Sequence, residues 1–214
     1  MGKKSEVRGV TKRIRRAYEK ADKYVEQVRG DFEITCSEGC AHCCKQLVMC
    51  TLPEALLAVD SLRQDVWRWN DLKSRLDEQV RWLMSPFSSV ERWFLTQRPC
   101  VFLRNDRCEV YENRPIMCRI QLVVSNPEEC RPPISKTVRK LNLDGLVRPI
   151  YETGKDAMRS AGMDVYLLPM PVSLKLATEV WESGFKSQAE VRTGIWESEK
   201  TALAYWKKKL GLQW

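Results

Sequence analysis

The chain has 214 residues, of which 43% are apolar and 30% are charged, and its formal net charge at pH 7 is +8. This length and composition can bury a hydrophobic core, which excludes an intrinsically disordered chain. Because no apolar run approaches the roughly 18 residues of a membrane span and no secretory leader opens the sequence, we expect a globular protein of the cytoplasm.

Residues 5–30 are predicted to form a basic amphipathic helix that ends at Gly30. Apolar residues recur at steps of three and four, and basic residues such as Arg13, Arg16 and Lys20 lie on the opposite face. Residues 1–30 hold ten Lys or Arg against four Asp or Glu, so most of the net charge lies here. Such a face can bind nucleic acid or an acidic protein; the simpler alternative is a solvated surface.

A dense run of cysteines follows. Four of the nine cysteines lie in Cys36-Ser-Glu-Gly-Cys40-Ala-His-Cys43-Cys44. In a reducing compartment this spacing favours a metal site over disulfides, because neighbouring thiolates converge at little cost in loop closure. The side chains of Cys43 and Cys44 should point in different directions. Both can then bind metal only if they serve two centres, or if a local distortion brings them together.

Helices are predicted next. Thr51-Leu-Pro53-Glu54 has the pattern of a capping box, and an apolar stripe continues to Leu83, which predicts a long helix over 53–84, either unbroken or broken near Asn70-Asp71. A short helix is expected from Ser88 to Leu95. The aromatic residues at helical spacing in this region are assigned to the core rather than to base stacking.

A small β-hairpin is predicted around the polar turn Asn105-Asp106-Arg107. Cys100 precedes its first strand, Cys108 begins its second strand, and Cys118 follows the turn Arg114-Pro115. Basic residues lie close in sequence to cysteines, where each either stabilises thiolates or is simply solvated. They are Lys45, Arg104, Arg107, Arg114, Arg119 and Arg131.

The chain after Pro132 has no cysteine and is predicted to form helices over 143–158, 171–181 and 187–210. We therefore expect a mainly α protein whose irregular cysteine-rich core carries the hairpin and is surrounded by helices. Three regions are expected. Residues 1–32 are the basic helix, 33–131 are the cysteine-cluster domain with the long helix inserted, and 132–214 are a helical extension packed on the core.

Zinc and a [4Fe–4S] cluster each take about four thiolates, so eight thiols suffice for two centres, and the spacing does not choose between the two metals. His42, the only histidine, is an alternative ligand. Cys50 is either a reactive thiol or, as we favour, a small buried residue. The spacing of Cys36, Cys40 and Cys43 also occurs in radical S-adenosylmethionine enzymes, but the repeating β/α pattern of those enzymes is missing here.

These motifs resemble the YkgJ-type cysteine-cluster family, described as zinc- or iron-chelating, over residues 33–131. The residues that carry the resemblance are the Cys36 to Cys44 run, Pro99-Cys100-Val-Phe-Leu, Cys108-Glu-Val-Tyr111-Glu-Asn-Arg114-Pro115 and Cys118-Arg119. The resemblance implies metal binding by Cys36, Cys40, Cys43, Cys44, Cys100, Cys108, Cys118 and Cys130, with no place for Cys50. Because the family includes a flagellin lysine N-methylase, it also implies an alternative function as a metal-dependent, methyl-transfer type of protein-modifying enzyme.

Overall fold

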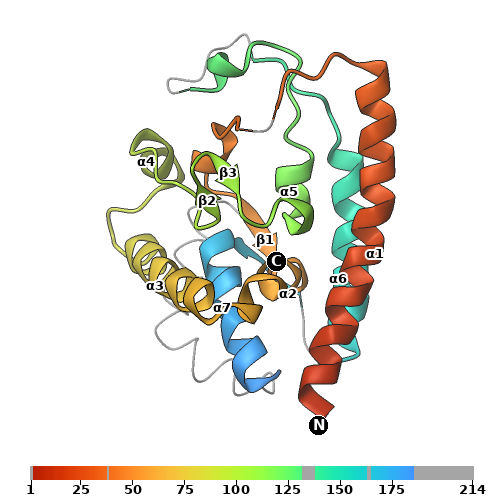
Figure 1. Cartoon of the computed structure of the whole chain (residues 1–214), viewed down its shortest axis with the longest axis vertical. Coiled ribbons are helices and arrows are strands. Elements are labelled where there is room, and N and C mark those ends of the chain that lie inside the picture. The colour runs from red at the N-terminus through yellow and green to blue at the C-terminus, as the bar shows by residue number, and fades with distance from the viewer. Residues whose placement is uncertain (1, 38, 132–137, 163–164, 186–214) are drawn as a thin grey trace.

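The structure is a computed structural model that describes residues 2–37, 39–131, 138–162 and 165–185 (Figure 1). Seven α-helices are described in these ranges: α1 (Gly2–Asp31), α2 (Leu52–Asp60), α3 (Val66–Leu83), α4 (Val90–Leu95), α5 (Ile116–Arg119), α6 (Val147–Arg159) and α7 (Met170–Ser183). Four short strands accompany them: β1 (Met49–Thr51), β2 (Leu103–Arg104), β3 (Arg107–Cys108) and β4 (Leu167–Pro169). The prediction of a mainly α fold with a small hairpin is confirmed.

Helix α1 lies along one side of the molecule next to α6 (Figure 1). Its predicted apolar stripe is buried, and Val7, Ile14 and Val25 are at most 4% exposed. The stripe therefore packs against the protein itself, on α6 and α2, while the basic residues face outward. The predicted helix over 5–30 is confirmed and begins earlier, at Gly2.

Helices α2 and α7 form the centre of the core. Every residue of α2 from Leu52 to Val59 is buried, and α7 packs along it. The indole of Trp181 in α7 donates a hydrogen bond to the carbonyl of Leu56 at 3.0 Å, so the two helices are also joined by a polar contact. This explains why the sequence of α2 is apolar on all sides rather than along one stripe.

Strands β1 and β4 form an antiparallel pair that the sequence analysis did not predict. Met49 lies opposite Pro169, and Thr51 lies opposite Leu167. The pair leads directly into α2 and α7, because each strand ends where one of these helices begins. It therefore fixes the C-terminal region against the segment that follows the cysteine run.

The prediction of one long helix over 53–84 is wrong. The chain forms α2 and α3, separated by a 3₁₀ turn over Leu62–Gln64, so the break comes before the Asn70-Asp71 position considered above. The Asp65 side chain starts α3 by accepting hydrogen bonds from the backbone N–H groups of Trp67 (2.9 Å) and Arg68 (3.1 Å). An N-cap of this kind accepts hydrogen bonds from the backbone N–H groups of the first helical turn. In a continuous helix these N–H groups would already be bonded to carbonyls of the preceding turn.

The hairpin of β2 and β3 is confirmed, with Leu103 opposite Cys108 and Arg104 opposite Arg107. Its two-residue loop is Asn105-Asp106, and both residues have positive φ, 47° and 58°. Two-residue hairpin loops of type I′ need positive φ at both central positions, which Asn and Asp tolerate better than most residues.

The helices predicted over 143–158 and 171–181 are confirmed as α6 and α7, and the one predicted over 187–210 lies outside the described residues. Within the described ranges, no helix combines the length and apolar character that crossing a bilayer requires.

Candidate metal centre

The eight predicted ligands come from segments that are far apart in the sequence. They are the loop after α1 with its 3₁₀ turn Cys43–Lys45, the segment before β2, β3 itself, α5 and the 3₁₀ turn Pro127–Cys130. Backbone hydrogen bonds join these segments. The Cys100 N–H donates to the Cys44 carbonyl at 2.7 Å, and the Thr35 N–H donates to the Val123 carbonyl at 3.0 Å. All nine cysteines are free thiols.

Electrostatic effects between the sulfurs show which thiols lie near one another. Burial raises the pKa of Cys130, and the charges of Cys36 and Cys40 add to this effect. Burial likewise raises the pKa of Cys118 well above its ordinary value, with further contributions from Cys100, Cys43 and Cys108. We call Cys36, Cys40 and Cys130 the outer thiols. The inner thiols are Cys44, Cys100, Cys108 and Cys118.

Cys43 lies between the two sets, because its charge acts on outer thiols, such as Cys36 and Cys130, and on inner ones. A side-chain hydrogen bond joins Cys43 to Cys44; it lowers the pKa of Cys43 to about 7 and raises the pKa of Cys44. The tight 3₁₀ turn Cys43–Lys45 carries both thiols and is where this pair is held together.

Backbone N–H groups point at three of the sulfurs. Val123 N lies 3.3 Å from Cys36 Sγ, and Phe102 N lies 3.5 Å from Cys100 Sγ. A backbone hydrogen bond from Val110 acts in the same way on Cys108 and lowers its pKa against the raising effect of burial. Hydrogen bonds donated to sulfur favour the thiolate, which is the form that binds metal.

Arg114 is the predicted cation whose charge acts on the thiols. It opposes the rise in pKa of Cys108 and Cys118, and its guanidinium lies 3.8 Å from the centre of the Tyr111 ring, which holds it in place. Lys140, which the sequence analysis did not single out, acts on Cys43 and Cys130. Three other predicted cations form ion pairs with carboxylates: Arg104 with Asp71 and Glu109, Arg131 with Glu128, and Arg119 with Asp22.

The donor set fits zinc or iron in its chemistry, because four thiolates suit either metal. Within the described residues, however, no three His, Cys, Asp or Glu side chains are already arranged to hold a metal ion. Metal binding at this site therefore requires the thiols to turn toward a common point.

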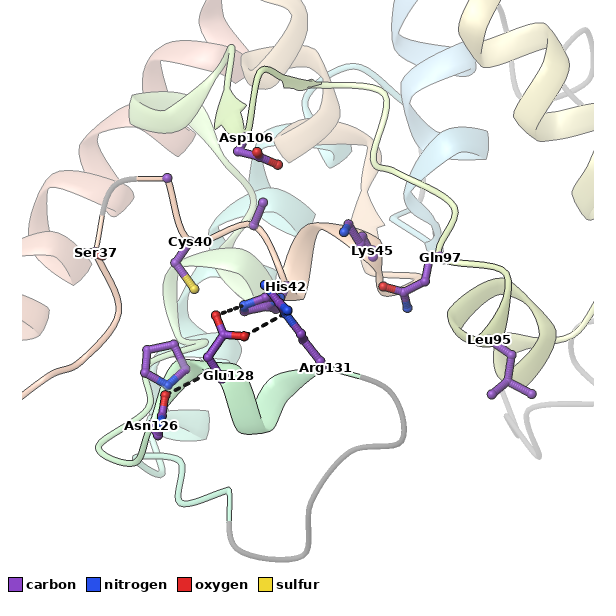
Figure 2. Close-up of a pocket in the computed structure, with 13 residues that line it drawn as sticks. Ser37, Cys40, His42, Lys45, Leu95, Gln97, Asp106, Asn126, Glu128 and Arg131 are labelled. Atoms are coloured by element: carbon purple, nitrogen blue, oxygen red, sulfur yellow. Dashed lines mark hydrogen bonds and ion pairs between the residues drawn. The ribbon is translucent and has the colours of Figure 1, made fainter.

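A cleft of about 890 Å³ opens beside Cys40, one of the outer thiols (Figure 2). Cys40 lines it, together with Lys45, Gln97 and Arg131. His42 also lines the cleft, and its Nε2 lies 3.6 Å from Glu128 Oε1, while Arg131 Nε lies 2.8 Å from the other oxygen of the same carboxylate. These contacts hold the Cys40 loop against the turn that carries Cys130.

A second carboxylate, that of Glu109, joins the hairpin to α3 and was not identified from the sequence. Three guanidinium groups surround it, those of Arg68 at 3.2 Å, Arg75 at 3.3 Å and Arg104 at 3.5 Å. Glu109 follows Cys108 directly, so this ion cluster positions the strand that carries an inner thiol.

A buried polar network links α1 to the cysteine domain, and it too was missed by the sequence analysis. Glu54 is 2% exposed and accepts hydrogen bonds from Tyr18 Oη (2.8 Å), Ile116 N (2.9 Å) and Thr51 N (3.1 Å). The guanidinium of Arg119, in α5, lies 4.2 Å from the Tyr18 ring centre and pairs with Asp22 of α1. The side chain of Arg119 therefore connects α5 to α1 and does not face the thiols.

We expect the metal-free protein to lose stability as the pH rises. Burial raises the pKa of Cys100 to about 12 and that of Cys118 well above its ordinary value. Above about pH 8.5 these thiols ionise in the unfolded chain but remain protonated in the folded chain. The free energy of unfolding therefore falls by about 1.4 kcal/mol for each thiol and each pH unit. Thermal unfolding followed by circular dichroism at pH 7 and pH 10 should show a fall of several degrees; an unchanged midpoint would mean that these sulfurs are solvated.

One family model matches the cysteine-rich part of the chain. Residues 35–133 match the family model CxxCxxCC, described as "Putative zinc- or iron-chelating domain", and all eight predicted ligands fall inside this range. No curated protein and no solved structure matches the chain. The match confirms the predicted resemblance to a cysteine-cluster family. Residues 35–133 of this chain are therefore similar to the cysteine-rich domains that this family model describes.

Proposed function

We propose that the protein binds metal through Cys36, Cys40, Cys43, Cys44, Cys100, Cys108, Cys118 and Cys130. The observation that carries the proposal is that these eight thiols, drawn from remote segments, act on one another electrostatically while backbone N–H groups point at three of the sulfurs. Thiols gathered only by hydrophobic packing have no need of such donors. Cys100 and Cys118 also act on Cys50, but Cys50 is fully buried and its thiol donates to the Thr51 carbonyl at 3.3 Å.

We further propose two centres that meet at the Cys43–Cys44 pair. Cys43 completes the outer set with Cys36, Cys40 and Cys130, and Cys44 belongs to the inner set with Cys100, Cys108 and Cys118. Each set then has four thiols, the number that zinc or a [4Fe–4S] cluster takes. When bound, either metal would supply coordination that stabilises the fold, and a cluster would also carry electrons.

Elemental analysis of anaerobically purified protein, combined with an absorption spectrum, tests this proposal. Two zinc ions per chain in a colourless sample, or iron and sulfide in equal amounts with visible absorption, would support it and would choose the metal. A protein that folds with all thiols free and no zinc or iron would contradict it.

A metal-dependent, methyl-transfer type of protein modification is the second candidate. The feature that favours it is the cleft beside Cys40, because an enzyme needs space for a substrate next to its metal. X-ray absorption spectroscopy of the loaded protein distinguishes the two functions. Four sulfurs on every metal indicate closed structural sites, whereas a lighter ligand at one metal indicates an open site.

We place this function in the cytoplasm, because nine free thiols persist best in a reducing compartment. The basic face of α1 remains the candidate surface for an acidic protein or a nucleic acid.

A further inference from the structure

A groove of about 450 Å³ lies between α1 and α6, which run side by side (Figure 1). Arg13, Arg16 and Lys20 of α1 form its basic wall. The remaining lining residues are apolar except for one threonine: Ala17, Ala21, Leu146, Pro149, Ile150 and Thr153. The groove therefore combines an aliphatic floor with a cationic rim.

The charge of this groove is not neutralised within the described residues. No acidic side chain lines it, and neither Arg16 nor Lys20 forms an ion pair in the part of the chain that the structure describes. Arg13 makes one weak contact, from its Nη1 to the backbone carbonyl of Asp156 at 3.4 Å. Three cations around an apolar floor favour an occupant that carries both negative charge and apolar groups.

The lining favours a polypeptide over a nucleic acid. No aromatic ring lines the groove, whereas proteins that bind single strands stack bases on aromatic side chains. Arg13, Arg16 and Lys20 are three and four residues apart and span about 10 Å along the helix, or two turns. An amphipathic helix with acidic residues one turn apart presents charge at the same interval, and its apolar side chains can enter the floor.

We propose that the groove between α1 and α6 binds an acidic, amphipathic segment of a partner protein. The carboxylates of that segment pair with Arg16 and Lys20, and its apolar side chains contact Ala17 and Ile150. This inference narrows the partner class suggested above and does not depend on metal binding, because no thiol lines the groove.

The test is a titration of the full-length, metal-loaded protein against a fluorescent 16-residue helical peptide in which glutamates one turn apart flank leucines. The double variant R16E/K20E should weaken binding by about tenfold or more, equivalent to about 1.4 kcal/mol. The matched control K12E/K23E changes the same charge on exposed positions of α1 outside the groove. It should change the dissociation constant by less than about twofold, in keeping with the weak effect of exposed charges.

A second pair of variants tests the floor without changing charge. Ala17→Leu and Thr153→Leu each fill part of the groove and should weaken peptide binding by about fivefold, because apolar contacts are lost to steric exclusion. Circular dichroism and metal content identify a variant that has failed to fold or load. If R16E/K20E and K12E/K23E weaken peptide binding equally, or if Ala17→Leu and Thr153→Leu have no effect, the groove is not the peptide-binding site.

Single-stranded RNA and vesicles of phosphatidylglycerol serve as competing probes. RNA or vesicles that bind more tightly than the peptide, and lose affinity in R16E/K20E, would overturn the proposal in favour of a nucleic acid or a membrane. Because metal content is measured in the same samples, a failure of the peptide-binding proposal can be distinguished from a failure of the metal-binding proposal.

Discussion

Replacing Cys118 by serine is expected to remove the metal of the inner set and to leave the protein largely unfolded or insoluble. Structural zinc contributes an apparent 10 to 16 kcal/mol, about as much as the whole stability of a domain. Cys118 is also the only predicted ligand on α5, the helix whose Arg119 and Ile116 connect to α1 and Glu54. Metal content per folded chain and the thermal unfolding midpoint measure the effect.

Cys40→Ser is the matched variant for the outer set, whose Cys40 borders the open cleft. We expect it to lose one metal centre and to keep the other, so that half of the metal remains. Cys50→Ala is the control and should keep all of the metal at a cost of about 1 kcal/mol in stability. Wild-type metal content in both serine variants would refute the ligand assignment, and loss of all metal from a Cys40→Ser variant that still folds would indicate a single shared centre.

Replacing Glu54 by alanine is expected to lower the free energy of unfolding by about 3 to 5 kcal/mol, because each buried donor left without an acceptor costs about 1 to 3 kcal/mol. The change leaves Tyr18 Oη and the N–H of Ile116 buried without their acceptor, and it removes the contact that joins α1 to α2 and α5. Urea unfolding followed by tryptophan fluorescence measures the effect.

Tyr18→Phe is the control for the Glu54 variant. It removes one hydrogen bond of 2.8 Å while the ring stays packed under Arg119, so it should cost only about 1 kcal/mol. A Glu54→Ala variant as stable as Tyr18→Phe would show that water enters and replaces the lost carboxylate.

The elements that could be predicted are those specified by neighbouring residues. The buried stripe of α1, the start of α2 at Thr51 and the Asn105-Asp106 turn all follow from interactions within a few positions along the chain. The break between α2 and α3 was missed because the apolar stripe continues through it, while the cap at Asp65 that starts α3 was not recognised.

The candidate site was likewise predictable from the sequence only in part. The density and spacing of the cysteines predicted metal binding, because short intervals between thiols are visible in the sequence itself, and the family resemblance implied the eight proposed ligands. Their division into an outer and an inner set depends on Cys100 meeting Cys44, and on Cys36 and Cys130 lying close together, and these contacts are made by chain folding alone. The roles of Glu54 and Glu109 were hidden for the same reason, since their partners lie in other helices.

The sequence by itself thus determined that this is a mainly α protein with a basic first helix, a hairpin and a cysteine-cluster domain. Only the tertiary structure decided how β1 pairs with β4, which thiols lie together and where the α1–α6 groove lies. The physical reason is range. Helical periodicity, capping and turn conformation depend on interactions between residues that are close in the sequence. Strand pairing, buried ion networks and grooves between helices depend on contacts between residues that are distant in the chain.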